Sequence, residues 1–407
     1  MKVLQINCVY KKGSTGKITS DLHRGLLDTG IESIVCYGRG TFVKEPGVYK
    51  TCSEWYSKLN NALSRVTGIM YGGCFFSTKR LISIIKKEKP DIVHLQCING
   101  YFVNIYRLIT WLKENHIKTV LTLHAEFMYT GGCGISIDCN QWNTNEGCGH
   151  PVCPRYYQET KSLFFDRTGT MWRRMKDTFE GFENDLYVVS VSPWLMKRAR
   201  QSVILGNMRH CVIYNGLNIN VFHPYSTEDL RKKHCCQGKK VVFHATPTFS
   251  SNPKHLKGGY YVIELAKRMP TVQFLVAGNC VGSFEVPQNV TLLGQVLDQE
   301  LLARYYSMAD VTVLTSKRET FSMVCAESLC CGTPVVGFKA GGPEEISIHE
   351  YSSFCDYGFI DGLMNLLQTA LEKRYDKQYL AEMAVKRYST EMIVEKYLEL
   401  YQEVIKV

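Results

Sequence analysis

Residues 311–336 read V-T-V-L-T-S-K-R-E-T-F-S-M-V-C-A-E-S-L-C-C-G-T-P-V-V. The apolar run Val311–Leu314 predicts a buried strand, the stretch that stops at Gly332 predicts a helix, and Pro334–Gly337 predicts the next strand. A strand, a helix and a second strand in this order form the crossover unit of a parallel sheet. The segment therefore predicts an α/β fold, in which ligands bind at the loops that leave the carboxyl ends of the strands.

The same alternation of short apolar runs and helical stretches extends in both directions from this segment. Further strands are predicted at Val3–Ile6, Ile34–Tyr37, Asp91–Leu95, Thr119–Leu123, Leu186–Val191, Val241–Phe243, Val272–Ala277 and Val290–Leu293. The pattern restarts after residue 240, so the sequence predicts two successive doubly wound, Rossmann-like domains whose crevices face one cleft.

The junction between the domains is predicted near Asn215-Gly216, in a stretch rich in Asn and Gly. We expect an N-terminal domain at residues 1–218, with a Cys-rich insert at about 130–155, and a C-terminal domain at 219–385. The last helical stretch, residues 386–407, has no strand after it, so we expect it to pack back toward the N-terminal domain.

The positive charge of the chain is unevenly distributed. Residues 1–220 hold 28 Lys and Arg against 17 Asp and Glu, whereas the whole chain has a formal net charge of +10. The first half therefore carries the entire excess, and such a surface attracts phosphates, acidic lipids or nucleic acid. An ordinary solvated basic surface is an equally good interpretation. No apolar stretch reaches 18 residues, and the N-terminus lacks the apolar core of a signal peptide.

The turn between residues 314 and 327 is the best candidate for chemistry. Thr320, Phe321 and Ser322 lie near a predicted helix start, where backbone N–H groups and the helix dipole favour anions. Glu319 lies just ahead of that start, and Glu327 lies inside the helix. An ionised carboxylate can accept hydrogen bonds from two hydroxyl groups, as a ribose offers.

With Glu319 and Glu327, the sequence Glu327–Val336 and Gly341-Gly342 resemble the E-x7-E region of family 4 of the retaining glycosyltransferases, glycosyl transferases group 1. The resemblance implies the GT-B fold. It also implies that Glu319 faces the donor sugar, that Glu327 binds the ribose, and that residues 320–322 hold the diphosphate or sugar. An isolated pair of helix carboxylates would instead be structural.

Lys257-Gly258 resembles the family's lysine-glycine pair, whose lysine neutralises the leaving diphosphate. The arginine that the family usually has after the preceding strand is absent, and His244-Ala245-Thr246-Pro247 stands there. Lys254 or His244 is expected to replace it at the donor site, although Lys254 could equally be a solvated loop residue.

The N-terminal domain contributes the remaining candidates by the same resemblance. Gly13 and Gly16 lie in a glycine-rich loop after the first strand, where the family's backbone approaches the donor phosphate and the acceptor. His124 ends a strand and resembles a histidine near the donor sugar, and the alternative is a histidine satisfied within the core. Asn99 and Tyr101 are expected at the acceptor site.

Cys133, Cys139, Cys148 and Cys153 have the spacing C-x5-C-x8-C-x4-C. No C-x2-C pair is present, so a structural zinc and simply packed thiols remain alternative interpretations, together with disulfides formed after purification. Their sequence context resembles the branch of the family that builds capsule, O-antigen and colanic acid.

The resemblance implies transfer of a hexose-type sugar from a nucleotide diphosphate sugar to a glycan acceptor, such as a lipid-linked oligosaccharide. No Asp-x-Asp is present, so we expect no cofactor for catalysis. We expect the protein in the cytoplasm and at the inner face of the membrane, with Trp172 or Trp111 beside basic residues as candidate contacts.

Three alternatives belong to other functional classes. A sugar-nucleotide 2-epimerase would share the architecture and the donor but would need no acceptor. A nucleic-acid-binding protein is suggested by charge alone, and no nucleic-acid module is recognisable, so we expect no nucleic-acid partner. An inactive sugar-nucleotide sensor would not need both glutamates and the lysine.

Overall fold

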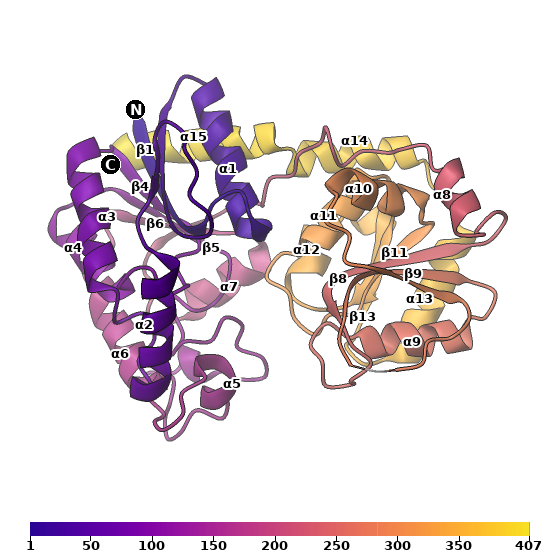
Figure 1. The fold of residues 1–407 in the computed structure, drawn as a ribbon, viewed down its shortest axis with the longest axis horizontal. Helices are drawn as coiled ribbons and strands as arrows, with labels where there is room; N and C mark the ends of the chain where they lie inside the picture. The colour runs from indigo at the N-terminus through magenta and orange to yellow at the C-terminus, as the bar shows by residue number, and fades with distance from the viewer. Residues whose placement is uncertain (283, 407) are drawn as a thin grey trace. The chain divides into compact units, whose positions relative to one another are not determined.

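The chain forms two compact units in the computed structural model, which describes residues 1–282 and 284–406. The first unit contains Met1–Gly216 together with the chain from Ile393 onward, and the second contains Leu217–Met392. The first is drawn mostly in indigo and magenta in Figure 1, and the second mostly in orange.

The first unit is built on a parallel sheet with the order β3-β2-β1-β4-β5-β6-β7. Its strands are β1 (Lys2–Val9), β2 (Glu32–Arg39), β3 (Val48–Lys50), β4 (Ile92–Leu95), β5 (Thr119–Leu123), β6 (Leu186–Ser190) and β7 (Arg209–Val212). Its helices are α1 (Gly13–Asp28), α2 (Glu54–Thr67), α3 (Phe75–Glu88), α4 (Ile105–Glu114), α5 (Tyr156–Thr160), α6 (Thr168–Phe179), α7 (Pro193–Gln201) and most of α15 (Thr390–Lys406), with a short 3-10 turn at Gln141–Asn143.

The second unit is built on a parallel sheet with the order β10-β9-β8-β11-β12-β13. Its strands are β8 (Val241–Phe249), β9 (Gln273–Cys280), β10 (Val290–Gly294), β11 (Val311–Leu314), β12 (Val335–Phe338) and β13 (Ser352–Cys355). Its helices are α8 (Glu228–Lys233), α9 (Gly259–Arg268), α10 (Gln299–Met308), α11 (Met323–Cys330), α12 (Gly342–Ile346), α13 (Ile360–Glu372) and α14 (Lys377–Tyr388), with a 3-10 turn at His349–Tyr351. Two doubly wound parallel sheets confirm the predicted fold class.

The central strands are buried along their whole length and are mostly apolar, because helices cover both faces of a doubly wound sheet. Strands β4, β5, β6, β11 and β12 are buried at every position. This explains why short apolar runs were a sufficient signal for the sheets.

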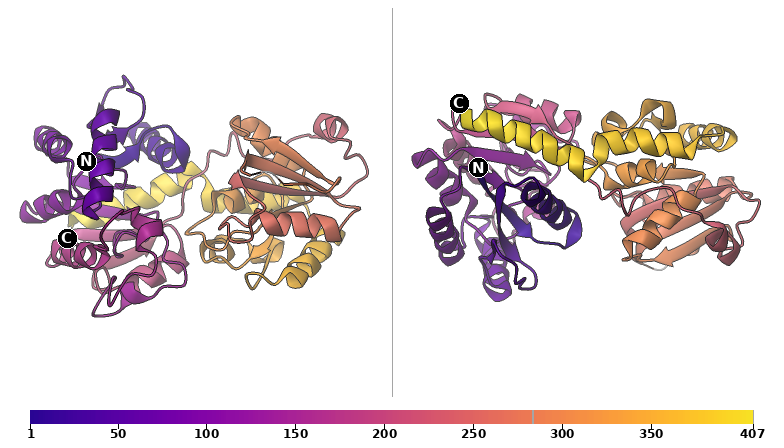
Figure 2. Two further views of the ribbon diagram at one scale, coloured as in Figure 1. Left: turned by 60° about the horizontal axis from the view of Figure 1, so that its bottom comes forward. Right: turned by 90° about the horizontal axis from the view of Figure 1, so that it is seen from above.

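Helix α15 completes the core of the first unit from the far end of the chain. Its apolar stripe, which includes Val394, Tyr397 and Tyr401, packs against residues of β1, β4, β5 and β6. Two tyrosines also anchor it: Tyr401 Oη lies 2.6 Å from His94 Nδ1, and Tyr397 Oη lies 2.9 Å from Thr122 Oγ1. Figure 2 shows this helix, in yellow, against the first unit.

The helical stretch predicted at residues 386–407 combines the end of helix α14 with helix α15, and the two helices meet at Ser389. Leu217 causes the break, because its N–H donates to the carbonyl of Tyr388 and its carbonyl accepts from the N–H of Thr390. These backbone groups would otherwise bond within one continuous helix.

Each sheet has one position where the chain reverses the direction in which strands are added. This position lies between β1 and β4 in the first unit and between β8 and β11 in the second. Ligands of doubly wound sheets bind beyond the carboxyl ends of the strands at such positions. Most of the predicted site residues follow these four strands, so the carboxyl edges of both sheets are candidate ligand sites.

Candidate functional site

Lys257 and Glu319 form an ion pair at the reversal point of the second sheet. Lys257 Nζ lies 2.6 Å from Glu319 Oε1, and both side chains are partly exposed. Lys257 follows β8 and Glu319 follows β11, and these strands are hydrogen-bonded neighbours. The structure thus joins two predicted site residues that are far apart in the sequence.

Backbone contacts hold the lysine loop against the loop after β11. Thr315 Oγ1 donates to the carbonyl of Lys257 over 3.0 Å, and the N–H of Lys317 donates to the carbonyl of Leu256 over 2.8 Å. Gly258 has φ +66°, and a Cβ there would lie 2.1 Å from the carbonyl oxygen of Thr315. Only glycine satisfies both conditions, so the position of Lys257 depends on Gly258.

The backbone of Glu319 is fixed by the loop after β12. Its N–H donates to the carbonyl of Ala340, and its carbonyl accepts from the N–H of Gly342, each over 2.9 Å. Glu344 in turn accepts hydrogen bonds from the N–H groups of Ala340 and Gly341. Glu319 is therefore held by the loops that follow three adjacent strands, β8, β11 and β12. Glu344 of helix α12 fixes the last of these loops.

Helix α11 begins directly after the residues that were predicted to lie near its start. Its first residue is Met323, and Ser322 is the N-cap, whose Oγ accepts from the N–H of Cys325 over 3.3 Å. Ser322 has φ 86°, a left-handed backbone that a non-glycine residue adopts at a cost of about 1–3 kcal/mol. Phe321 has a buried side chain that meets the ring of Tyr388, so only its backbone can serve a ligand.

Glu327 lies on α11 and is partly exposed. Its Oε2 accepts a hydrogen bond of 2.9 Å from the hydroxyl of Tyr306, a fully buried residue of α10. Burial and the neighbouring carboxylate of Glu327 hold the pKa of Tyr306 well above its ordinary value. Tyr306 therefore remains a hydroxyl donor and orients the glutamate.

His244 does not supply the positive charge that we expected of it. Burial lowers the pKa of His244 to about 4, so its ring is neutral near pH 7. Nδ1 lies 3.0 Å from the carbonyl oxygen of Val313, which can only accept, so Nδ1 carries the proton. Nε2 is then an acceptor, and it has no hydrogen-bond partner in the described part of the chain. Lys254 is an exposed residue of the loop after β8.

The glycine-rich loop of the first unit follows β1. Gly13 is the first residue of α1 and is exposed, whereas Gly16 is buried. A Cβ at Gly16 would lie 3.1 Å from Val9 Cγ2, so glycine allows the start of α1 to pack on the end of β1. Glu45 forms an ion pair with Lys11 in the same loop.

Asn99 and Tyr101 follow β4, next to that loop in the sheet order. Asn99 Oδ1 accepts from the thiol of Cys97 over 2.7 Å. The ring of Tyr101 lies 5.2 Å from that of Tyr71, measured between centroids. The predicted acceptor residues thus follow the two strands that flank the reversal point of the first sheet.

His124 directly follows β5 and is a neutral hydrogen-bonding group. Its Nε2 lies 2.8 Å from Gln96 Oε1, and burial lowers its pKa to about 4. An amide oxygen only accepts, so Nε2 donates and Nδ1 is the unprotonated nitrogen. The ring is therefore neutral and offers no cation near pH 7.

The four cysteines of the insert line one small cavity of about 10 Å³, together with Trp142 and Thr168. Burial raises the pKa of Cys148 to about 12 and also raises that of Cys133 and Cys153. Within residues 1–282 and 284–406, no group of three or more His, Cys, Asp or Glu side chains is placed to hold a metal ion. The structural zinc therefore stays a prediction.

A buried ion pair that the sequence reasoning missed anchors this insert. Glu126 is fully buried, and its Oε1 lies 2.5 Å from Nε of Arg198 on α7. Ser136 and Tyr129 also donate to the carboxylate. An acidic residue inside the apolar stretch after His124 was the signal that could have revealed it, because buried carboxylates are paired.

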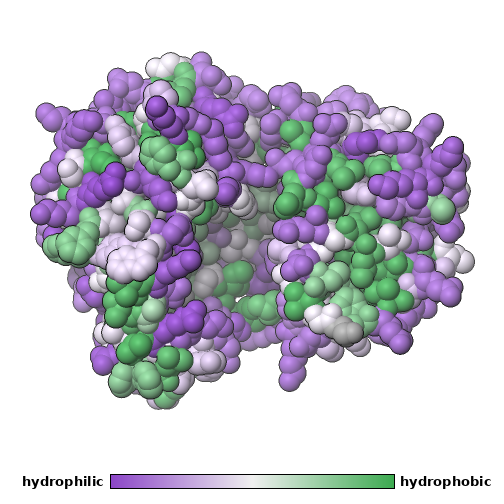
Figure 3. Space-filling model, viewed as in Figure 1, coloured by the Kyte–Doolittle hydropathy of each residue, from purple (hydrophilic) through white to green (hydrophobic). Residues whose placement is uncertain are grey.

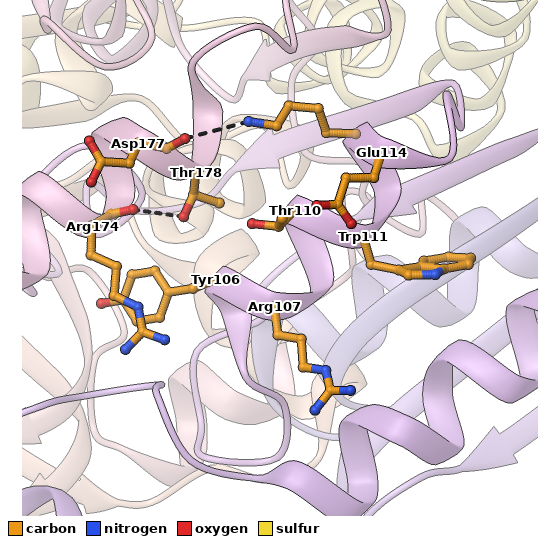
Figure 4. Close-up of a pocket in the computed structure, with 9 residues that line it drawn as sticks. Tyr106, Arg107, Thr110, Trp111, Glu114, Arg174, Asp177 and Thr178 are labelled. Carbon is orange, nitrogen blue, oxygen red and sulfur yellow. Dashed lines mark hydrogen bonds between the residues drawn. The ribbon is translucent and has the colours of Figure 1, made fainter.

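A groove of about 430 Å³ lies between α4 and α6, away from the predicted site residues, none of which lines it. Figure 4 shows Arg107 of α4 and Arg174 of α6 in this groove, with Trp111 beside Glu114. Trp172, a predicted membrane contact, is buried and cannot serve, since its indole packs in the core.

Residues 228–387 match the family described as Glycosyl transferases group 1. The chain is 22% identical to the putative colanic acid biosynthesis glycosyl transferase WcaC of Escherichia coli K12, over 99% of this chain and 100% of that protein. It is 23% identical to N-acetyl-alpha-D-glucosaminyl L-malate synthase of Bacillus anthracis, over 56% of this chain and 62% of that protein.

Solved structures share the fold over the whole chain. Sucrose-phosphate synthase of Thermosynechococcus elongatus has a TM-score of 0.68 at 17% identity and covers 100% of both chains. Anabaena HepE in complex with UDP-glucose has a TM-score of 0.64 at 16% identity, covering 99% of this chain and 100% of that one. These similarities confirm the GT-B fold class and give no support to the epimerase alternative.

Proposed function

We propose, from the premise that this chain is a glycosyltransferase with a Glycosyl transferases group 1 domain, that it moves a hexose-type sugar with retention. The donor is a nucleotide diphosphate sugar, and the acceptor is a glycan on a lipid carrier in bacterial surface polysaccharide synthesis. Two similar proteins support this choice: WcaC is a putative colanic acid biosynthesis glycosyl transferase, and the structure of HepE was solved in complex with UDP-glucose.

The pairing of Lys257 with Glu319 at the start of α11 carries the proposal. The ammonium group is held where a diphosphate would be drawn by the dipole of α11. On donor binding, Lys257 exchanges one Glu319 oxygen for phosphate oxygens, and Glu319 is left to accept hydrogen bonds from the sugar. The strained backbone of Ser322 belongs to the same turn, as expected of a functional loop.

In the proposed reaction, the bond from the sugar's anomeric carbon to the diphosphate oxygen breaks, and its electron pair leaves with the diphosphate. Lys257 and the backbone of Thr320, Phe321 and Ser322 stabilise that developing charge. The acceptor hydroxyl forms the new bond from the same face and gives its proton to the leaving phosphate. Glu327, oriented by Tyr306, holds the ribose hydroxyls, and Nε2 of His244 accepts a hydrogen bond from the donor.

The first unit supplies the acceptor side in this proposal. Gly13, Asn99 and Tyr101 contact the acceptor, and Gly16 allows close approach of the donor phosphate. His124 accepts a hydrogen bond from the transferred sugar, which suits a neutral ring.

Catalysis is proposed to need no metal, since Lys257 and the α11 turn carry the charge that a cation would otherwise stabilise. A zinc bound by Cys133, Cys139, Cys148 and Cys153 would be structural. The protein would work in the cytoplasm at the inner membrane face. The described helices include none that is long and apolar enough to cross a membrane.

The test starts with donor binding, followed by product analysis. A panel of nucleotide diphosphate sugars is screened by thermal shift, and the best is incubated with a lipid-linked acceptor in the presence of EDTA. We expect stabilisation by one donor and an NMR coupling constant of the product that reports retained configuration. Hydrolysis or epimerisation of the donor without glycosidic product would contradict the proposal.

A further inference from the structure

In helix α2 of the first unit, apolar residues face solvent and small or polar residues face the protein, which is the reverse of an ordinary surface helix. Its solvent-facing stripe is apolar and consists of Trp55, Leu59, Leu63 and Val66, of which Trp55 is 71% and Leu63 52% exposed. Its buried positions are small or polar: Ser57, Asn60 and Ser64. Spacings of four, four and three residues place the stripe on one side of the helix. We name this stripe the α2 face.

Exposed aromatic residues extend the α2 face at both ends. Near its first turn, the hydroxyl of Tyr56 accepts from the N–H of Phe76, which is 71% exposed, and Phe75 lies beside it. Near its last turn, the N–H of Leu163 donates to the carbonyl of Arg65, and Leu163 is followed by exposed Phe164 and Phe165. In Figure 3, hydrophobic side chains, in green, gather among hydrophilic ones in the part of the first unit where Figure 1 draws α2. A contiguous apolar surface of this kind marks a binding surface.

Basic side chains border this apolar surface. Lys58 and Arg65 of α2 are exposed beside the stripe. The guanidinium of Arg107 lies 4.8 Å from the ring centroid of Phe75, and that of Arg167 lies 5.4 Å from that of Phe165.

Two carboxylates near this surface are already engaged. Glu54 pairs with Arg39 over 3.1 Å, and Asp166 accepts from backbone N–H groups of Cys153 and Thr168. The border of the apolar surface is therefore positive.

We propose that the α2 face and its flanking aromatics dock on a bilayer surface that contains anionic lipids. Apolar and aromatic side chains enter the boundary of the acyl chains, and the cations around them meet phosphate headgroups. The proposal extends the proposed function, whose acceptor is lipid-linked, by assigning the surface that meets the membrane.

A second copy of the chain fits this surface less well. A symmetric dimer through α2 would place the same residues against each other, so the basic border of one copy would meet the basic border of the other. Like charges at a close interface oppose association. A lipid surface supplies the opposite charge.

The test uses the full-length protein and vesicles of phosphatidylcholine with or without phosphatidylglycerol, and needs neither donor nor acceptor. We expect cosedimentation with the anionic vesicles that weakens as salt is raised. Leu59→Glu with Leu63→Glu should lower partitioning by at least about tenfold, because two apolar side chains no longer enter the boundary. The matched control is Leu297→Glu, since Leu297 of the second unit is 78% exposed, and it should bind as the unaltered protein does.

Fluorescence provides a second measurement. The exposed indole of Trp55 should shift its emission to the blue on anionic vesicles, and Trp55→Phe should abolish the shift while Trp111→Phe keeps it. Equal vesicle binding by the double variant, Leu59→Glu with Leu63→Glu, and by the control Leu297→Glu would overturn the proposal. So would an absence of vesicle binding, or a dimer that the double substitution dissociates. Donor binding measured on the same samples separates this outcome from a failure of the proposed function.

Discussion

The carboxyl edges of the two sheets carry different chemistry. At the β8/β11 edge, the neighbouring groups are an ion pair, Lys257 with Glu319, and a carboxylate held by a tyrosine, Glu327 with Tyr306. In the first sheet, His124 follows β5, the strand next to β4, and is neutral and bonded to an amide. The Lys257–Glu319 pair suits a diphosphate, and the neutral ring of His124 suits hydroxyl groups. The two units share one type of fold, but the side chains at the carboxyl ends of their strands differ.

Removing the ammonium group of Lys257 should have the largest effect on the difference between the two edges. Lys257→Ala should lower kcat/KM for sugar transfer by about 100- to 1,000-fold, the usual effect of deleting a group that stabilises developing negative charge. Initial rates of nucleoside diphosphate release in the presence of acceptor measure it. Lys254→Ala is the control from the same loop and should stay within about threefold, as for an exposed residue. Similar losses in both variants would refute the assignment.

Glu327→Ala should weaken the binding of donor nucleotide by about tenfold to a hundredfold, because hydrogen bonds from ribose hydroxyls to a charged group are lost. Isothermal titration calorimetry measures the Kd. Tyr306→Phe keeps the carboxylate and removes only its orienting hydroxyl, so its effect should be smaller. An unchanged Kd in Glu327→Ala would show that the ribose lies elsewhere.

Gly258→Ala tests how the lysine loop is held. The added Cβ meets the carbonyl of Thr315 in a left-handed backbone, so the free energy of unfolding should fall by about 1–3 kcal/mol. Urea denaturation measures it. Gly238 has φ +71° with no atom within 4 Å of a Cβ, so Gly238→Ala carries the backbone strain alone. If Gly258→Ala lowers the free energy of unfolding no more than Gly238→Ala does, the lysine loop is not held tightly against Thr315.

Lowering the pH should destabilise both units alike, because each contains a histidine that burial keeps neutral. Burial lowers the pKa of His124 and His244 to about 4, below the ordinary 6.5. Between these values the unfolded chain binds protons that the folded chain does not, so stability falls as the pH falls from 6.5 toward 4. We expect each histidine to contribute a loss of about 1–2 kcal/mol at pH 5.

Urea denaturation at pH 7 and pH 5 checks this expectation. His124→Asn and His244→Asn should each show a smaller difference between the two pH values than the unaltered protein. If neither substitution changes that difference, the two rings are not held neutral in the folded state.

The sequence was sufficient for the fold class because the buried parallel strands are continuous apolar runs between Gly and Pro punctuation. Helix α2 was not predicted as a surface feature. Its apolar stripe has the period of any core-facing helix, and periodicity does not tell which side faces water. Only the burial of Ser57, Asn60 and Ser64 reveals its orientation.

For the site, the sequence identified residue types but not their partners. Lys257 and Glu319 were each singled out, yet their contact depends on the paths of two loops from neighbouring strands. His244 was considered as a cation, and its burial beside Val313, which makes it neutral, is a property of tertiary packing. Glu126 and Arg198 were missed because their pairing links segments far apart in the chain.

The return of α15 to the first sheet has a consequence for biosynthesis. The residues that cover β1, β4, β5 and β6 emerge from the ribosome only after the entire second unit has been made. During translation the nascent first unit therefore waits with an uncovered apolar face, the kind of exposed surface that chaperones recognise. The second unit, whose segment Leu217–Met392 is continuous, is free to fold ahead of the one that precedes it.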